Sequence, residues 1–378
     1  MQKTKSKFGV ICASLTLTAL AFAASSVSET ANEKTIAAFR ADLAAKFKAA
    51  DKNYDSVIQG KDGWMFFVPE VRSVSVGKFW GKDAAKVGQA VDPKFADPLP
   101  AILDFKAQLD KVGIKLLLVP VPPKAVIYAD KVSGKIASPA KDGVLPRVDS
   151  AHQEFYKVLR DNGVNVLDLT DYFLKDRESE ILDNMTGKVL GHTWTYCKQD
   201  THWSSGGASL AAYLISNAIG LYIPRASQKY SSRGKFLTIK GDLWDALPTE
   251  VKRPKQESII VNYVGTIDPK NKSTLIPVPT SQSSPVLLLG DSHTLVWHEG
   301  GDMHTKGAGL VDHMALNLGF PIDLIGVRGS GATPARTSLL RRARANPNYL
   351  KGKKWVVWCF SAREWTESAG WQKVPVVK

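Results

Sequence analysis

The sequence predicts an α/β protein with a three-layer α/β/α fold, in which helices cover both faces of a mainly parallel sheet. Two observations predict it. Amphipathic stretches of helical length alternate with short apolar runs over most of the 378 residues. One of these runs, 286–289, is apolar at every position, as is typical of a strand buried on both faces. The length is sufficient for one large α/β domain with embellishments.

The first element is predicted to be an export signal covering residues 1–23. Lys3, Lys5 and Lys7 precede an apolar run over residues 8–24, and Ala21-Phe22-Ala23 has the small-x-small pattern of a cleavage site. An uncleaved anchor is the alternative, but the run is short for a bilayer span of about 20 residues. We therefore expect a soluble, exported mature chain.

The net charge of the chain limits the kinds of binding partner that we expect. The formal net charge is +14, which suits an anionic polysaccharide or a phospholipid surface, although a basic and merely soluble surface explains it equally well. Nucleic acid is not expected as a partner because the chain is predicted to be exported and has no dense basic run. Cys197 and Cys359 are expected either to form a disulfide or to be two buried thiols.

The first half of the mature chain is predicted to open with an amphipathic helix over 33–48 and a hairpin that turns at Lys61-Asp62-Gly63. Two helix–strand pairs follow, and Gly113 and Gly163 stand where a left-handed helix cap is needed. The predicted segments are helix 100–111 with strand 114–119, and helix 148–160 with strand 164–169.

The second half continues this alternation after one interruption. The predicted segments are helix 204–221, strand 286–289, helix 310–318, strand 322–327, helix 333–345 and strand 355–360. Residues 225–285 are polar with short β-like runs, so we expect an inserted β-rich cap within a single domain, 24–378.

Two distant segments have the composition of an acyl-transfer site. Leu289-Gly290-Asp291-Ser292 predicts a buried strand that ends in a tight turn and presents a serine with a free backbone N–H. Asp200 and His202 share a face if their segment is extended, so the carboxylate can orient the imidazole. Nucleophile, base and orienting acid are the minimum for a serine ester mechanism. The alternatives are an ordinary turn and a structural His–Asp pair.

These segments belong to a longer series of motifs. The series comprises Gly60-Lys61-Asp62-Gly63-Trp64-Met65-Phe66-Phe67 with Glu70 and Arg72, Val119-Pro120-Val121-Pro122-Pro123-Lys124, Asp200-Thr201-His202-Trp203, Gly290-Asp291-Ser292, Gly307-Ala308-Gly309-Leu310, and Trp358 with Arg363. In this order and over nearly the whole mature chain, it resembles the alginate O-acetyltransferases of the Gram-negative periplasm, the AlgJ/AlgX-like branch of SGNH hydrolase-like folds.

The resemblance implies a periplasmic O-acetyltransferase with Ser292 as nucleophile, His202 as base and Asp200 as orienting acid. It also implies a membrane-bound O-acyltransferase as acetyl donor, an exopolysaccharide acceptor such as alginate, and other polysaccharide export components as partners. The family often has an acidic residue at the position of Cys359. No carboxyl-terminal carbohydrate-binding module is expected after the last strand.

Further residues are candidates for the oxyanion and the substrate. A glycine-rich loop with Arg328, Gly329 and Gly331 follows one predicted strand. Arg363 follows the last predicted strand, and we expect it either to bind an anion or to form a salt bridge with Glu364. Among the ten tryptophans, Trp194, Trp203, Trp297 and Trp365 lie near the candidate segments, so a groove that stacks sugar rings is considered beside ordinary core packing.

No metal and no cofactor are expected. The spacing of His293, His298, His304 and His313 matches no common zinc pattern, so these histidines are predicted to lie in loops and on the surface. Two other functions remain open from the sequence: a secreted carbohydrate acetylesterase with the same triad, and a non-catalytic polysaccharide-binding component of an export complex.

Overall fold

The computed structural model describes residues 28–53, 55–139, 143–182, 189–222, 227 and 229–377. The predicted signal peptide, 1–23, lies outside these ranges. Within them, no helix combines the length and the apolar character that a membrane crossing requires.

A five-stranded sheet forms the centre of the molecule, and each of its pairings is parallel. The strands run in the spatial order β13-β10-β14-β3-β4. Their bounds are β3 (Lys115–Val121), β4 (Asn165–Val166), β10 (Val286–Gly290), β13 (Asp323–Gly326) and β14 (Trp355–Ser361). The predicted mainly parallel sheet is therefore confirmed.

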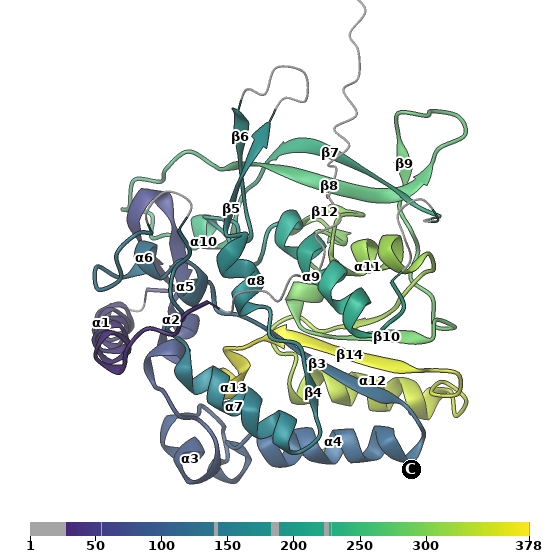
Figure 1. Cartoon of the computed structure of the whole chain (residues 1–378), viewed down its shortest axis with the longest axis horizontal. Helices are drawn as coiled ribbons and strands as arrows, with labels where there is room; N and C mark the ends of the chain where they lie inside the picture. Colours follow the sequence, from purple (N-terminus) through teal and green to yellow (C-terminus); the bar gives the residue numbers. More distant parts are fainter. Residues whose placement is uncertain are drawn as a thin grey trace, which may run out of the picture.

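The sheet divides the interior into two cores because successive side chains of a strand point to opposite faces. On β10, Leu288 packs into one core, whereas Leu287 and Leu289 pack into the other. Helices α9 (Ser205–Ala218) and α11 (Leu310–Leu318) cover the first face, and α4 (Leu99–Lys111), α7 (Ser150–Asp161) and α12 (Thr333–Ala345) cover the second (Figure 1). These are the three predicted layers.

Local chemistry explains where several helices begin and end. Helix α1 (Glu33–Lys52) begins after Asn32, whose side chain accepts a hydrogen bond from the Thr35 N–H. Helices α4 and α7 are followed by Gly113 and Gly163, with φ of +71° and +75°, which a side chain would disfavour.

The last strand of the sheet is shorter than the sequence predicts. Only Asn165–Val166 pairs with β3, although residues 164–169 are a strand by pattern. Asp168 explains the difference, since its carboxylate accepts a hydrogen bond from the Thr170 N–H and pairs with Arg147 at 2.7 Å. These contacts turn the chain out of the sheet and start helix α8 (Thr170–Lys175).

Several smaller elements lie outside the central sheet. The predicted hairpin is formed by β1 (Val57–Gln59) and β2 (Met65–Phe67), and several elements have no counterpart among the sequence predictions. These are α2 (Val68–Ser75), α3 (Ala84–Val87), α5 (Lys124–Ile127), α6 (Ala129–Val132), β5 (Glu178–Leu182), β6 (Val189–Trp194), β11 (Glu299–Gly300), β12 (Met303–Lys306) and α13 (Glu364–Glu367).

Residues between α9 and β10 form a separate antiparallel sheet of β7 (Ser231–Thr238), β8 (Ser258–Ile267) and β9 (Leu275–Ile276). This sheet packs against α9 and α11, on the side of these helices away from the central sheet (Figure 1). The short helix α10 (Asp242–Asp245) lies between β7 and β8.

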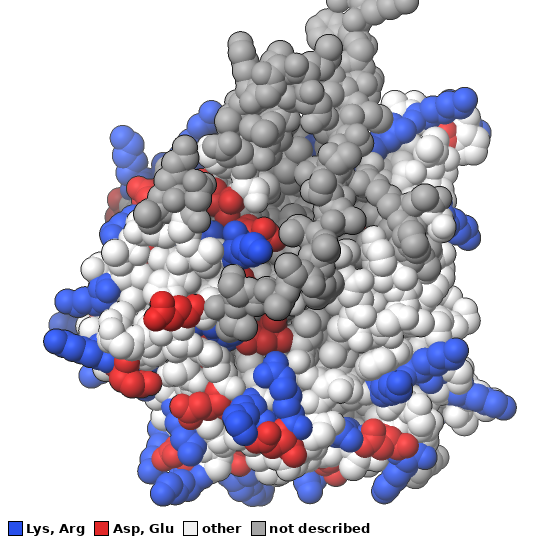
Figure 2. Space-filling view, viewed as in Figure 1, with Lys and Arg blue, Asp and Glu red and all other residues white. Residues whose placement is uncertain are grey.

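Charged side chains are dispersed on the face shown in Figure 2. Lys and Arg project from much of the periphery, and Asp and Glu lie among them along the lower part of the view. On this face the excess of positive charge is therefore not gathered into one patch.

Candidate active site

Ser292 lies immediately beyond the carboxyl end of β10. It opens a 3-10 turn, Ser292–Thr294, whose N-cap Asp291 accepts a hydrogen bond from the His293 N–H. The first N–H of a helix has no partner within that helix, so the Ser292 amide is available to a ligand. Gly290 is needed here because a Cβ at this position would lie 1.8 Å from the Cys359 carbonyl oxygen.

The structure brings Ser292, His202 and Asp200 together. The Ser292 hydroxyl lies 2.8 Å from His202 Nε2, and His202 Nδ1 lies 2.8 Å from Asp200 Oδ1. All three residues are buried, with Ser292 6 % and His202 8 % exposed. A hydroxyl that donates to an imidazole, which in turn donates to a carboxylate, is the order of contacts that activates a serine.

The Asp200 segment is bent rather than extended, which corrects the sequence-based expectation. Asp200 Oδ1 accepts hydrogen bonds from both the backbone N–H and Nδ1–H of His202. A carboxylate that binds the amide two residues later closes a tight turn. The two side chains therefore meet because the chain turns, not because they share one face of a strand.

Lys124 and Asp242 hold this turn in place, although no sequence pattern links either of them with it. Lys124 is buried and its Nζ donates to the carbonyls of Lys198 (3.0 Å) and Asp200 (2.9 Å). The Asp242 N–H donates to Asp200 Oδ2 at 2.9 Å, and the Asp242 carboxylate accepts from the Thr201 N–H at 2.7 Å. Asp242 lies within the interrupting segment, so no local sequence pattern connects it with the triad.

Burial and hydrogen bonding act in opposite directions on the charged pair. Burial alone would raise the pKa of Asp200, but hydrogen bonds from His202 and His304 outweigh it and hold the pKa well below 3.8. Burial alone would lower the pKa of His202, but the hydrogen bond and the charge of Asp200 outweigh it and raise the pKa above 6.5. The geometry therefore favours an ionised carboxylate beside a strongly basic imidazole.

A second Asp–His pair lies beside the nucleophile. His293 Nδ1 is 3.2 Å from Asp291 Oδ1, and the other oxygen of Asp291 accepts from the Ser361 N–H at 2.7 Å. Burial is the largest influence on His293 and lowers its pKa. Its ring centroid is 5.0 Å from that of His202, so it forms an inner wall of the site.

Arg363 is buried and lies close to the triad. Its guanidinium makes a long hydrogen bond of 3.4 Å to Ser361 Oγ and lies 5.5 Å from the centroid of the Phe67 ring. Within the described ranges no carboxylate lies within 4.0 Å of it, so the salt bridge with Glu364, which the sequence left open as an alternative to anion binding, is not formed. Glu364 instead accepts a hydrogen bond from Ser330, and burial raises its pKa to about 7.

The glycine-rich loop only partly approaches the site. A Cβ at Gly331 would lie 3.0 Å from the Asp291 amide nitrogen, so this backbone passes directly beside the turn that holds Ser292. Gly329 has a φ of +92°, which serves the turn. Arg328 is half-exposed and its guanidinium binds Asp302 and Glu299 rather than any residue of the triad.

The tryptophans form the scaffold of the site, which corrects the expectation of a sugar-stacking groove for three of them. Trp203 and Trp297 are 0 % exposed and Trp365 is 1 % exposed, so their rings are not accessible to a sugar. Trp297 Nε1 donates to the Trp203 carbonyl at 2.9 Å and thereby ties together the chain on both sides of the triad. Trp194 is partly exposed, with the Lys198 ammonium 4.2 Å from its ring centroid.

The prediction of loop and surface histidines is also wrong. His293 and His313 are buried, and the side chains of His298 and His304 are 19 % and 6 % exposed. Three of the four have carboxylate partners, namely Asp291, Asp312 and Asp200. Burial of an imidazole that is paired with a carboxylate costs less free energy than burial of an unpaired one. The spacing of the histidines in the sequence does not reveal these partners.

Cys197 and Cys359 are buried free thiols. Burial raises the pKa of each thiol well above 9.0, which makes both unreactive. Cys197 Sγ lies 3.8 Å from the Trp203 carbonyl, so this thiol packs behind the triad loop.

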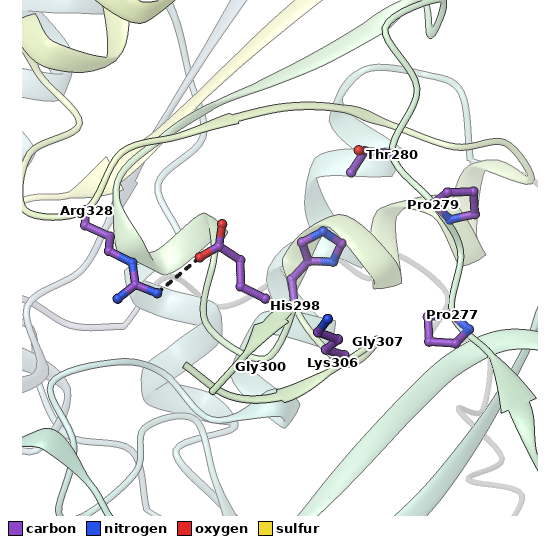
Figure 3. A pocket seen from close by; sticks show the side chains of 9 residues that line it. Pro277, Pro279, Thr280, His298, Gly300, Lys306, Gly307 and Arg328 are labelled. Atoms are coloured by element: carbon purple, nitrogen blue, oxygen red, sulfur yellow. Dashed lines mark hydrogen bonds and ion pairs between the residues drawn. The ribbon is translucent and has the colours of Figure 1, made fainter. Parts of the chain in front are cut away.

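A pocket of about 600 Å³ opens on the β11–β12 side of the site. Pro277 and Pro279 stand on one side of it and Arg328 on the other, with His298 and Lys306 between them (Figure 3). None of the triad residues lines this pocket.

Comparison with known proteins identifies the relatives of the chain. A family model described as "SGNH hydrolase-like domain, acetyltransferase AlgX" matches residues 57–362. The curated relatives include the protein named "Probable alginate O-acetylase AlgJ" of Pseudomonas aeruginosa, 26 % identical over 211 residues that cover 53 % of this chain and 44 % of that protein. The protein of the same name from Pseudomonas syringae pv. tomato is 24 % identical over 257 residues, which cover 67 % of this chain and 55 % of that protein. The chain thus spans about half the length of these relatives.

Solved structures have the same fold. The O-acetyltransferase domain of Pseudomonas putida AlgJ matches with a TM-score of 0.56 and 20 % identity, over 82 % of this chain and 92 % of that domain. Pseudomonas aeruginosa AlgX matches with a TM-score of 0.52 and 14 % identity, over 86 % of this chain and 65 % of that protein. The predicted SGNH hydrolase-like fold and the predicted family are therefore confirmed.

Proposed function

We propose that this chain, which belongs to the family of SGNH hydrolase-like domains of the acetyltransferase AlgX, is an O-acetyltransferase that works through an acetyl ester on Ser292. One observation carries the proposal: His202 lies between the Ser292 hydroxyl and the Asp200 carboxylate, at 2.8 Å from each. This geometry supports both halves of a ping-pong transfer.

In the first half, Ser292 Oγ attacks the carbonyl carbon of the acetyl donor while His202 Nε2 takes the hydroxyl proton. The tetrahedral intermediate collapses when the leaving group departs with that proton, and acetyl-Ser292 remains. In the second half, an acceptor hydroxyl gives its proton to the same nitrogen and attacks the ester. Collapse then forms the new acetyl ester and returns the proton to Ser292.

Negative charge develops on the carbonyl oxygen in both halves. The Ser292 N–H at the start of the 3-10 turn is one donor for that oxygen. We assign Arg363 as the second, because the residue is buried, lies close to the triad and has no carboxylate within 4.0 Å in the described ranges. The carboxylates of Glu70, Asp291 and Glu364 interact electrostatically with this cation at longer range, which offsets part of the cost of its burial.

The acceptor is an exopolysaccharide, alginate or another glycan, since the curated relatives are named as alginate O-acetylases. The donor is a membrane-bound O-acyltransferase, the place of action is the periplasm, and other polysaccharide export components are partners. The net charge of +14 is suited to an anionic polymer.

The test is intact-protein mass spectrometry after incubation with an activated acetyl ester, with and without an oligosaccharide acceptor. We expect label on Ser292 in the native chain, no label in Ser292→Ala, and acetylated sugar when acceptor is present. Release of free acetate alone, unaffected by any acceptor, would indicate the esterase. A Ser292→Ala variant that acetylates sugar at the native rate would refute the mechanism.

A further inference from the structure

Asp200 is bound by two imidazoles, not one. His202 Nδ1 lies 2.8 Å from Oδ1, and His304 Nε2 lies 3.1 Å from Oδ2. His304 comes from strand β12, 104 positions further along the chain. Nothing in the triad mechanism requires this second ring, so its placement calls for a physical reason.

The protein holds His304 in a conformation that is unfavourable for its backbone. His304 has a φ of +69°, and Trp297, in the turn that precedes strand β11, has a φ of +66°. Left-handed backbone in a residue with a side chain costs on the order of 1 kcal/mol and persists where surrounding contacts impose it. Here the contacts converge on one ring, because the indole of Trp297 stacks on His304 with centroids 4.3 Å apart.

Trp297 is itself fixed to the triad segment. Its Nε1 donates to the carbonyl of Trp203, the residue that follows His202. Its backbone N–H donates to the Met303 carbonyl and its carbonyl accepts from the Ala308 N–H, at 2.9 Å and 2.8 Å. The indole of Trp297 therefore packs on one face of the His304 ring, whose Nε2 contacts the Asp200 carboxylate. The same indole is hydrogen-bonded to the segment that holds His202.

The four hydrogen bonds on Asp200 divide evenly between its two oxygens. Oδ1 accepts from the N–H and Nδ1–H of His202, and Oδ2 accepts from the Asp242 N–H and His304 Nε2–H. A carboxylate can rotate about its Cβ–Cγ bond, and at Oδ2 the Asp242 N–H and the His304 ring together oppose this rotation. Within the described ranges, His304 is the one side chain that holds Oδ2.

We propose that His304 is a positioning residue that fixes the plane of the Asp200 carboxylate, so that Oδ1 keeps His202 directed at Ser292. This role rests on the proposed function and deepens it. The hairpin that presents His304 also lines the pocket of Figure 3 through Glu299, Gly300 and Lys306. His304 acts through Asp200 and does not itself touch Ser292.

The decisive comparison is between two substitutions in the full chain. His304→Phe keeps an aromatic ring for Trp297 to stack on but has no N–H, whereas His304→Gln loses the ring and keeps an amide donor. We expect His304→Phe to slow acetylation of Ser292 by an activated ester about 10- to 100-fold, with KM changed less than about twofold. We expect His304→Gln to remain within about threefold of the native rate.

A surface pair provides the control. His192 lies 3.3 Å from Glu178 on an exposed hairpin, so His192→Gln removes an imidazole–carboxylate contact without touching the triad, and the native rate should persist. Far-UV circular dichroism and thermal melting verify the fold of each variant. Should His304→Phe not fold, His304→Gly replaces it, because glycine accepts a φ of +69° without strain.

Nuclear magnetic resonance gives a readout that does not depend on turnover. The Nδ1–H proton of His202 should be observed in the native chain and in His304→Gln, and should broaden or shift in His304→Phe. An unchanged proton and a native rate in His304→Phe would overturn the proposal, as would equal slowing in the Phe and Gln variants. Absence of any acetyl-serine in the native chain would instead count against the proposed function, and the His202 proton would then decide the question alone.

Discussion

Replacement of Gly290 by alanine tests whether the end of β10 determines the position of Ser292. The new Cβ would lie 1.8 Å from the Cys359 carbonyl oxygen and 2.7 Å from Thr294 Cγ2. Side-chain carbons are essentially never found closer than 3.0 Å to such atoms, so the distance to the carbonyl must increase by about 1.2 Å. This carbonyl belongs to the backbone of the adjacent strand β14, in which Cys359 pairs with Gly290. It therefore cannot rotate away as a side chain could.

The displacement has two separable effects. A shift of that size lengthens the ladder bonds at the end of β10 beyond hydrogen-bonding range, and overpacking of this kind costs about 1–3 kcal/mol of the free energy of unfolding. Ser292 follows two residues later and needs its hydroxyl at 2.8 Å from His202 Nε2. A misplacement of about 1 Å lowers a catalytic rate on the order of 100-fold.

The assays are urea unfolding and the rate of Ser292 acetylation measured by mass spectrometry. Gly134→Ala is the matched control, because a Cβ at Gly134 meets nothing within 4 Å and its φ is not positive. We expect the control to behave as the native chain. Native stability together with a native rate in Gly290→Ala would refute the packing argument, and lost stability with a native rate would refute the link to Ser292.

Three further predictions follow from the same geometry. The acetylation rate should fall as pH decreases through the pKa of His202, which lies above 6.5, because the base must be neutral; a pH-independent rate between pH 5 and 8 would contradict this. Glu364 binds a proton more tightly when folded, with its pKa raised from 4.5 to about 7, so its contribution to stability is present below pH 4.5 and is lost as pH rises to 7. Glu364→Gln should therefore have a free energy of unfolding that, relative to the native chain, is up to about 3 kcal/mol more favourable at pH 8 than at pH 4. Denaturant titrations at the two pH values measure this difference. Lys124→Met removes the donor to the carbonyls of residues 198 and 200 and should slow acetylation about tenfold, whereas Lys157→Met, an exposed substitution, should not.

Elements with a strong local signal were predicted well from the sequence. Helices 310–318 and 333–345 have the predicted bounds, and the strands at 286 and 355 begin where expected. Their apolar periodicity and their flanking glycines or prolines act within a few residues. Strand 164–169 was predicted too long because Arg147, distant in sequence, binds Asp168 and turns the chain away.

The chemical identities of Ser292, His202 and Asp200 as candidates came from the sequence alone, since the residue types and the turn after β10 are local features. The residues around them were decided by tertiary structure. His304, Asp242 and Lys124 reach Asp200 from three other elements, and Trp203 and Trp297 are buried rather than exposed to substrate. The reason is physical: a turn or an amphipathic helix is specified by neighbouring residues, whereas the partner of a buried charge is whichever donor the completed fold brings within about 3 Å.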